Sequence, residues 1–144
     1  MKYLLWDIDG TLLLTNYAGV AALKHSIKTI YGIDNLQFTH GLAGRTDTFI
    51  AKEAIKEIKG QASPQEITAL LSLYTSTLPK FLGKKAGHLL PHVQSTLENL
   101  DKRAEVNSLL LTGNCEKAAQ AKLDFFSITQ YFDFELSAFG EISD

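Results

Sequence analysis

The chain of 144 residues is 45% apolar and 21% charged, which is the size and composition of one ordinary soluble domain rather than of a disordered segment. Its net charge of −2, without any Lys- or Arg-rich block, argues against nucleic acid or an anionic membrane as the main partner, and we expect a small substrate. The apolar runs are too short for a membrane span, and the first of them ends at Asp7, too early for a signal peptide. A single cysteine excludes an internal disulfide. We therefore expect a cytoplasmic location.

Residues 3–12 form a short apolar run that ends in Asp7 and Asp9, followed by Gly10 and Thr11. Such a run predicts a strand that is buried on both faces in the middle of a parallel sheet. The two carboxylates then lie at the carboxyl end of the strand, where open α/β sheets bind ligands. Side chains two residues apart in a strand point the same way, and two close anions need a cation. The alternative is that both are ordinary turn residues, since Asp-Gly is a common turn dipeptide.

The next seventy residues or so predict consecutive helices rather than strands. Apolar residues at helical spacing predict a first helix within residues 16–32, and Thr46 is a plausible cap for a second helix that runs through Ile58. A capping box with proline at the first helical position, Ser63-Pro64-Gln65-Glu66, begins a third helix. Because these helices interrupt the alternation of strands and helices, we interpret residues 16–85 as an insertion with its own small core.

The alternation of helices and strands resumes after this insertion. A short helix is expected at residues 93–100, a second buried strand at residues 106–111 and a helix at about residues 115–125. Apolar and acidic residues then alternate over residues 132–136, which predicts a third strand with at least one polar face. The fold class expected from this order is α/β with a parallel sheet.

The second predicted strand ends in Thr112-Gly113-Asn114. A hydroxyl at the carboxyl end of a parallel strand, followed by the free N–H groups of a helix start, is a site for phosphate oxygens. The same three residues also make a good turn, and Asn114 is an equally good helix N-cap. Cys115, near the helix start, is a candidate for a lowered pKa, although a small buried residue is the preferred interpretation.

Residues 6–12, Trp-Asp-Ile-Asp-Gly-Thr-Leu, resemble the first motif of the haloacid dehalogenase (HAD) superfamily in its phosphotransferase branch. The whole chain resembles members with a type 1 helical cap, such as the phosphoglycolate phosphatases. The resemblance implies a Rossmannoid three-layer core with a parallel sheet, formed by residues 1–15 and 86–144 and incomplete here. Residues 16–85 would be the inserted helical cap.

This resemblance also implies residue roles. Asp7 would be the nucleophile that becomes an aspartyl phosphate, and Asp9 the general acid and base. Both would bind Mg²⁺, Asp9 through its backbone carbonyl. Thr112 would hold the transferring phosphoryl group, and the other phosphate-binding candidates are Gly10, Thr11, Gly113 and Asn114.

Arg45 lies in a loop that is similar to the cap loop that faces the active site in this family. It is therefore a candidate substrate contact, although a solvated loop cation is an equally good interpretation.

Two family motifs are missing from the sequence. The family has a third-motif lysine after the third strand or at a neighbouring helix start, and an acidic pair at the end of the fourth strand. Lys117 and Lys122 are interpreted as surface residues of the helix after Thr112, while Glu141 and Asp144 have no fourth strand to follow. We therefore expect this chain to be the front part of a longer enzyme.

Three hypotheses follow from the sequence. The first is a Mg²⁺-dependent phosphohydrolase that acts on a small phosphomonoester through an aspartyl-phosphate intermediate. The second is a sugar phosphomutase of the β-phosphoglucomutase type, which keeps the phosphoenzyme but releases little phosphate. The third is a non-catalytic fragment that binds phosphate or a partner. The sequence leaves the substrate and the oligomeric state open.

Overall fold

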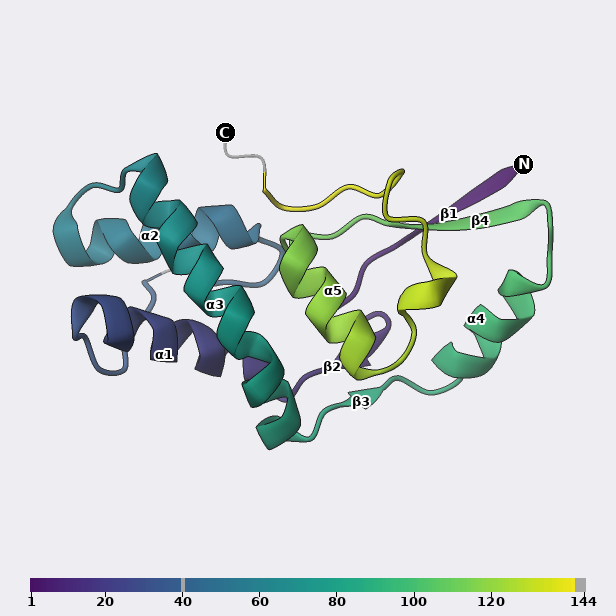
Figure 1. Ribbon diagram of the computed structural model, residues 1–144, viewed down its shortest axis with the longest axis horizontal. Coiled ribbons are helices and arrows are strands. Elements are labelled where there is room, and N and C mark those ends of the chain that lie inside the picture. Colours follow the sequence, from purple (N-terminus) through teal and green to yellow (C-terminus); the bar gives the residue numbers. More distant parts are fainter. Residues whose placement is uncertain (40, 142–144) are drawn as a thin grey trace.

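The computed structural model describes residues 1–39 and 41–141. Figure 1 shows the helices within residues 18–85 gathered at one end of the molecule and the N-terminal strand toward the other, with α5 (Glu116–Phe125) between them. Asp144, named above among the candidate acids, lies outside the described residues. No helix of the described part of the chain is both long and apolar enough to span a membrane.

The three expected helices of the insertion are confirmed as α1 (Ala18–Tyr31), α2 (Asp47–Lys59) and α3 (Pro64–Lys85). The Thr46 hydroxyl caps α2 by accepting from the Phe49 N–H, and Ser63 with Glu66 forms the capping box of α3. Helix α1 ends at Gly32 and α2 at Gly60, both in the left-handed conformation that glycine adopts without strain.

One apolar cluster joins these helices to α5. Its buried members come from α1 to α3 and also from the start of α5, where Cys115 and Ala118 belong to it. The helical insertion therefore does not close its core by itself, and its division from the rest of the chain at residues 16 and 85 stays a prediction. The remaining buried members are Ala18, Ala22, Leu23, Ile27, Ala51, Ala54, Ile55, Leu70, Tyr74, Leu78 and Leu82.

Strands β1 (Lys2–Trp6) and β4 (Val106–Leu110) pair in parallel, with Trp6 opposite Leu110. The helices α4 (Val93–Asp101) and α5 flank β4 in the chain, and a second apolar cluster includes Ile8, Leu97 and Leu110. The α/β class with a parallel sheet is thus confirmed.

A short antiparallel pair closes the base of the helical insertion. Strands β2 (Leu13–Leu14) and β3 (His88–Leu89) pair through Leu14 and His88, a contact that the sequence pattern does not predict. The Asn16 amide donates to the carbonyls of Lys85 and Ala86, and a Cβ on Gly87 would overlap the Leu14 carbonyl. The points where the chain enters and leaves the insertion are therefore held side by side.

The predicted burial of the first strand on both faces is wrong. Tyr3 is 56% exposed and Leu5 62% exposed. Within the described residues β1 has β4 as its one partner strand, and these two side chains remain more than half exposed.

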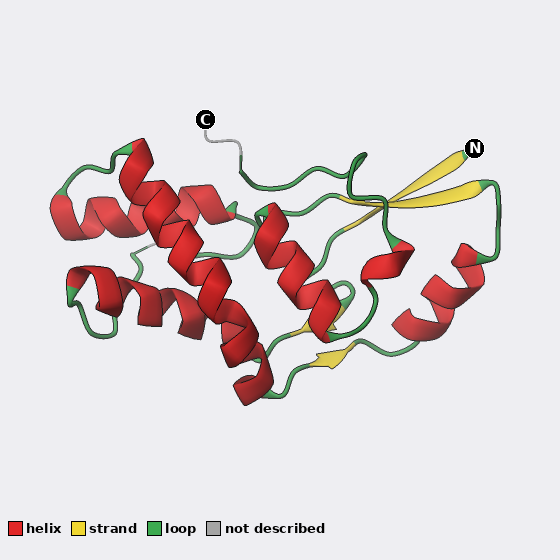
Figure 2. Ribbon diagram, in the orientation of Figure 1, coloured by secondary structure: helices red, strands yellow, loops and turns green. Residues whose placement is uncertain are grey.

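The third strand predicted at residues 132–136 is also wrong. The 3₁₀ helix η1 (Thr129–Tyr131) is followed by loop, as Figure 2 shows. The Asp133 carboxylate accepts from the Leu136 N–H, and the backbone carbonyl of Asp133 accepts from the Ser137 hydroxyl. These local bonds turn the chain and compete with a strand. The parallel contact with the second strand occurs later, as a bridge between Leu111 and Ala138.

The N-terminus of α2 lies against the loops that follow β4 and η1. The Asp47 N–H donates to the Gly113 carbonyl at 2.8 Å, and the Thr48 hydroxyl donates to the Gly140 carbonyl at 2.8 Å. A Cβ on Gly113 would lie 2.6 Å from the Arg45 carbonyl, and one on Gly140 would overlap the Gly113 carbonyl. The close approach of the insertion to this loop therefore requires glycine at both positions.

We expect Gly140→Ala to destabilise the full-length protein by roughly 1–3 kcal/mol, because the new methyl group forces backbone apart at this contact. Gly83→Ala, in α3 with no atom within 4 Å of the new Cβ, is the control and should stabilise by roughly 0.5–1 kcal/mol. Urea unfolding of both variants measures the difference. A Gly140→Ala protein as stable as the control would contradict the contact described here.

Candidate active site

Asp7 and Asp9 follow β1 directly and line one cavity of about 760 Å³ together with Thr112. The Leu111 N–H donates to the Trp6 carbonyl at 2.8 Å, so the two strands end side by side. The structure therefore brings the two carboxylates and the threonine hydroxyl together, as the strand pattern predicts.

The turn after Asp9 uses most of its backbone donors internally. Gly10 has a φ of 79°, and its N–H donates to the Leu13 carbonyl, while the Thr11 N–H donates to the Ile8 carbonyl. These bonds fix the turn, and they engage the two N–H groups that a phosphate would otherwise bind. The phosphate-binding roles of Gly10 and Thr11 stay predictions.

Asn114 is a link between strand ends and not a helix cap. Cys115 occupies the N-cap position of α5. The buried Asn114 amide donates to Asp9 Oδ2 at 2.8 Å and to Thr112 Oγ1 at 2.8 Å, and its backbone N–H donates to the same hydroxyl at 3.1 Å. The Thr112 oxygen accepts both bonds, which leaves its hydrogen to donate to a phosphate oxygen.

Lys122 is the residue that the sequence interpretation placed wrongly. Its side chain is 6% exposed rather than on the surface. The ammonium lies 2.9 and 3.0 Å from the two carboxylate oxygens of Asp9 and 2.7 Å from Asn114 Oδ1. Lys117, on the same helix, is exposed as expected.

A sequence signal for Lys122 does exist. The buried face of α5 consists of Ala118, Ala119, Lys122 and Leu123, a spacing of three and four residues. Lys122 falls on this face, two turns after Asn114. Charge alone led to the surface interpretation, whereas the helical period places the lysine inside.

Two carboxylates cover the N-terminus of α5. Asp47 Oδ2 accepts from the Cys115 N–H at 2.8 Å, and Glu141 Oε1 accepts from the Glu116 N–H. Negative groups are favoured at a helix N-terminus. The first N–H groups of the helix are thus occupied, while the Gly113 N–H has no acceptor among the described residues and remains a candidate phosphate donor.

Burial disfavours the charged forms of the acidic groups near this helix. It raises the pKa of Asp47, although the Cys115 N–H and the Lys122 charge oppose the effect. It also raises the pKa of the Cys115 thiol to about 12. Cys115 is 4% exposed, so its interpretation as a small buried residue is confirmed, and burial shifts its pKa upward rather than downward.

The insertion supplies the other wall of the large cavity. Val20, Leu23, Leu71 and Tyr74 give it an apolar and aromatic lining. Arg45 also lines the cavity, with its guanidinium 5.0 Å from the centre of the Phe49 ring. The substrate contact proposed for Arg45 stays a prediction.

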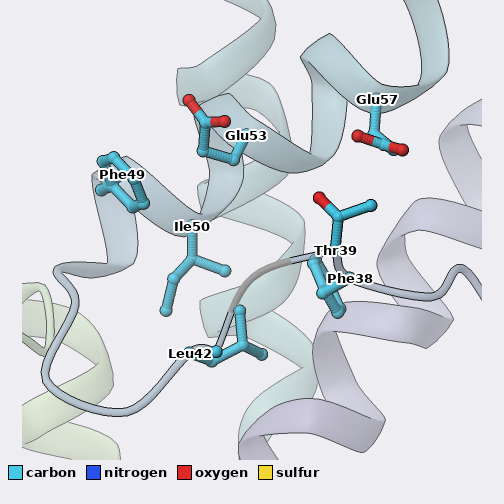
Figure 3. Close-up of a pocket in the computed structure, with 8 residues that line it drawn as sticks. Phe38, Thr39, Leu42, Phe49, Ile50, Glu53 and Glu57 are labelled. Carbon is cyan, nitrogen blue, oxygen red and sulfur yellow. The ribbon is translucent and has the colours of Figure 1, made fainter.

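A second hollow is lined by residues 38, 39, 41 and 42 and by α2 (Figure 3). Figure 3 shows Glu53 and Glu57 on the helix side and Phe38 on the loop side. Its volume of about 20 Å³ is room for about one water molecule. None of the predicted catalytic residues lines it, so the large cavity is the candidate active site.

The oxygen atoms of the candidate active site that could act as metal ligands suit a weakly held Mg²⁺ ion. Among the described residues no group of three or more His, Cys, Asp or Glu side chains is arranged to hold a metal. The Asp9 carboxylate is bound to Lys122, whereas its backbone carbonyl accepts no hydrogen bond within the described part of the chain. The Asp7 carboxylate and this carbonyl would hold Mg²⁺, which commonly keeps several waters and takes one or two protein oxygens.

The family model of the haloacid dehalogenase-like hydrolases matches residues 4–139. The chain therefore belongs to this family. No curated protein matches it significantly.

Solved structures share the fold at low sequence identity. A HAD hydrolase of family IA, variant 3, from Entamoeba histolytica is 20% identical with a TM-score of 0.70, over 100% of this chain and 63% of that one. CbbY from Rhodobacter sphaeroides, in complex with phosphate, is 18% identical with a TM-score of 0.72, over 99% and 65%. A predicted phosphoglycolate phosphatase from Haemophilus somnus is 18% identical with a TM-score of 0.63, over 97% and 62%. The chain thus spans a little less than two thirds of these proteins.

The raised pKa of Asp47 predicts a pH-dependent stability. Its unfolded-state pKa is about 3.9, so on raising the pH the unfolded chain releases this proton first. The folded state then holds more protons, and stability falls as the pH rises above about 4, until the folded-state pKa is passed.

Asp47→Asn keeps an oxygen acceptor for the Cys115 N–H but carries no charge. We expect it to match the wild type near pH 4 and to be more stable at pH 7. Urea unfolding from pH 4 to pH 8 in the full-length protein measures this difference, with the exposed Asp101→Asn as the control. A stability gap that shrinks with rising pH would contradict the burial of the Asp47 charge.

Proposed function

We propose that the protein containing this chain is a Mg²⁺-dependent phosphohydrolase that acts on a small phosphomonoester through an aspartyl phosphate on Asp7. The observation that carries the proposal is that Asp7, Asp9 and Thr112 line one cavity at the ends of two paired parallel strands. Membership of a hydrolase family supports the same reaction class. A cytoplasmic location is part of this proposal.

The proposed reaction has two steps. In the first, a carboxylate oxygen of Asp7 bonds to phosphorus, the bond to the leaving oxygen breaks, and that oxygen takes a proton from Asp9. In the second, a water oxygen bonds to phosphorus and gives its proton to Asp9. The bond from phosphorus to Asp7 breaks and restores the carboxylate. When bound, Mg²⁺ supplies positive charge that offsets the phosphoryl oxygens.

The cavity supports a small phosphorylated metabolite as substrate. The core wall carries the reacting groups, and the apolar wall of the insertion leaves room for an organic leaving group. CbbY, which is similar in fold, has been solved with phosphate and, in a mutant form, with xylulose-(1,5)bisphosphate. The layout that resembles phosphoglycolate phosphatases favours a hydrolase over a mutase.

Asp7→Asn should abolish the phosphoenzyme in the full-length protein, because an amide is a poor nucleophile and a poor metal ligand. Asp9→Asn keeps the backbone carbonyl but loses proton transfer, so turnover should fall by roughly 10²–10⁴-fold. Intact-mass measurement of the phosphoenzyme and assay of released phosphate test both variants, with Asp101→Asn as the control. A stable phosphoenzyme in the Asp7→Asn variant would contradict the assignment of Asp7 as the nucleophile.

Interconversion of sugar phosphates with little released phosphate would indicate a mutase instead of a phosphohydrolase.

Arg45→Ala should raise KM for phosphomonoesters with large polar leaving groups more than for a minimal aryl phosphate. Arg45 lines the cavity from the insertion rather than from the strand ends where phosphoryl transfer takes place. Comparing kcat and KM for two such substrates measures the difference. Equal losses on both would count against a substrate contact.

A further inference from the structure

Tyr74 is a buried polar side chain of the large cavity, and the proposed reaction gives it no role. It lies on α3, is 5% exposed and belongs to the cavity wall that the insertion supplies. We propose that the Tyr74 hydroxyl determines specificity by donating a hydrogen bond to an uncharged oxygen of the leaving group, so that phosphate esters of polyols and sugars are preferred to alkyl phosphates. This inference rests on the proposed function and names the substrate class of the same site.

The Tyr74 hydroxyl has no hydrogen-bond partner within residues 1–39 and 41–141. No fully buried side-chain nitrogen or oxygen atom in this part of the chain lacks a partner. The hydroxyl oxygen is therefore not sealed inside the protein: the ring of Tyr74 is buried, and the oxygen reaches the open space of the cavity. Because a buried tyrosine normally finds a partner for its hydroxyl, the partner here has to come from the cavity.

Gly19 on α1 leaves the room that this hydroxyl occupies. A Cβ on Gly19 would lie 3.3 Å from Tyr74 Oη, which is the one atom of the other described elements within 4 Å of it. Glycine is less favourable than alanine in a helix, and Gly19 itself lines the cavity. The position of the hydroxyl, between α1 and α3 at the edge of the cavity, thus depends on glycine at residue 19.

The groups around the hydroxyl favour an uncharged partner. Burial raises the pKa of Tyr74 well above its usual value, and the negative charges of Asp47 and Asp9 act in the same direction. The phenol therefore keeps its proton and can donate it in a hydrogen bond. The same two carboxylates repel a second anion at this point, whereas an uncharged hydroxyl or carbonyl oxygen meets no such repulsion.

The place of Tyr74 in the cavity assigns its contact to the leaving group. Asp7 and Thr112 follow the strand ends, whereas Tyr74 comes from the other wall, so a phosphoryl group held by the first two directs the organic part of the substrate toward Tyr74. The hydroxyl is the one polar side-chain group that α1 and α3 offer to this cavity, and a few such groups on an apolar wall set specificity. The remaining residues by which these two helices line the cavity are Gly19, Val20, Leu23 and Leu71.

Tyr74→Phe removes the hydroxyl and keeps the ring. In the full-length protein with Mg²⁺, kcat/KM is measured for two pairs of esters, each pair with and without hydroxyl groups: glycerol 3-phosphate with propyl phosphate, and glucose 6-phosphate with cyclohexylmethyl phosphate. We expect Tyr74→Phe to lower kcat/KM for the hydroxylated esters roughly 3–10-fold, the usual effect of one uncharged hydrogen bond, and to leave the alkyl esters unchanged. Tyr3→Phe, exposed on β1, is the control and should change neither.

Gly19→Ala gives a readout that does not depend on activity. Its methyl group crowds the hydroxyl in the wild type, whereas in Tyr74→Phe it has room and alanine is the better helix former. We expect Gly19→Ala to raise the urea midpoint of the Tyr74→Phe protein more than that of the wild type, and to lower kcat/KM for the hydroxylated esters as Tyr74→Phe does. An equal shift of the midpoint in both backgrounds overturns the position of the hydroxyl.

The ways in which these experiments can fail are distinct. A wild-type protein that releases no phosphate from any of the esters overturns the proposed function. With an active wild type, an equal loss on both members of each pair, or no loss on either, overturns the role of Tyr74 alone. A larger loss on phosphoglycolate, whose leaving group carries a carboxylate, than on the hydroxylated esters overturns the assignment of an uncharged partner.

Discussion

The ion pair between Lys122 and Asp9 joins parts of the chain that are 113 residues apart. Asp9 lies after the first strand, and Lys122 lies on α5, the helix that follows the second. Their contact, with Asn114 between them, fixes how α5 lies across the two strand ends. Because α5 also contributes Cys115 and Ala118 to the core of the insertion, the same helix connects the charged site to the apolar contacts of α1 to α3.

Local signals were sufficient for most of the fold. The helix limits depend on neighbouring residues, such as the Ser63 and Glu66 capping box, so they are readable from sequence. Strand burial was not readable, because the exposure of Leu5 depends on which elements cover the sheet. The strand predicted after Tyr131 failed because Asp133 makes local turn bonds that an alternating pattern does not reveal.

The site was predictable where it follows strand ends and unpredictable where it depends on contacts across the fold. The convergence of Asp7, Asp9 and Thr112 follows from two parallel strands that end together. The partners of Asn114 and Lys122 are set by the orientation of α5, which no local pattern gives. Charge was a poor guide for Lys122, because a lysine is buried only when a distant partner offsets its charge.

The insertion and the strands meet where the backbone allows little adjustment. Gly113 follows Thr112 in the chain, and its carbonyl accepts from the Asp47 N–H while the Asp47 carboxylate accepts from the Cys115 N–H. One residue of α2 therefore contacts both sides of the turn that presents the Thr112 hydroxyl. Moving α2 away from the cavity would break these bonds. The position of the insertion and the conformation of this turn are thus linked through Asp47.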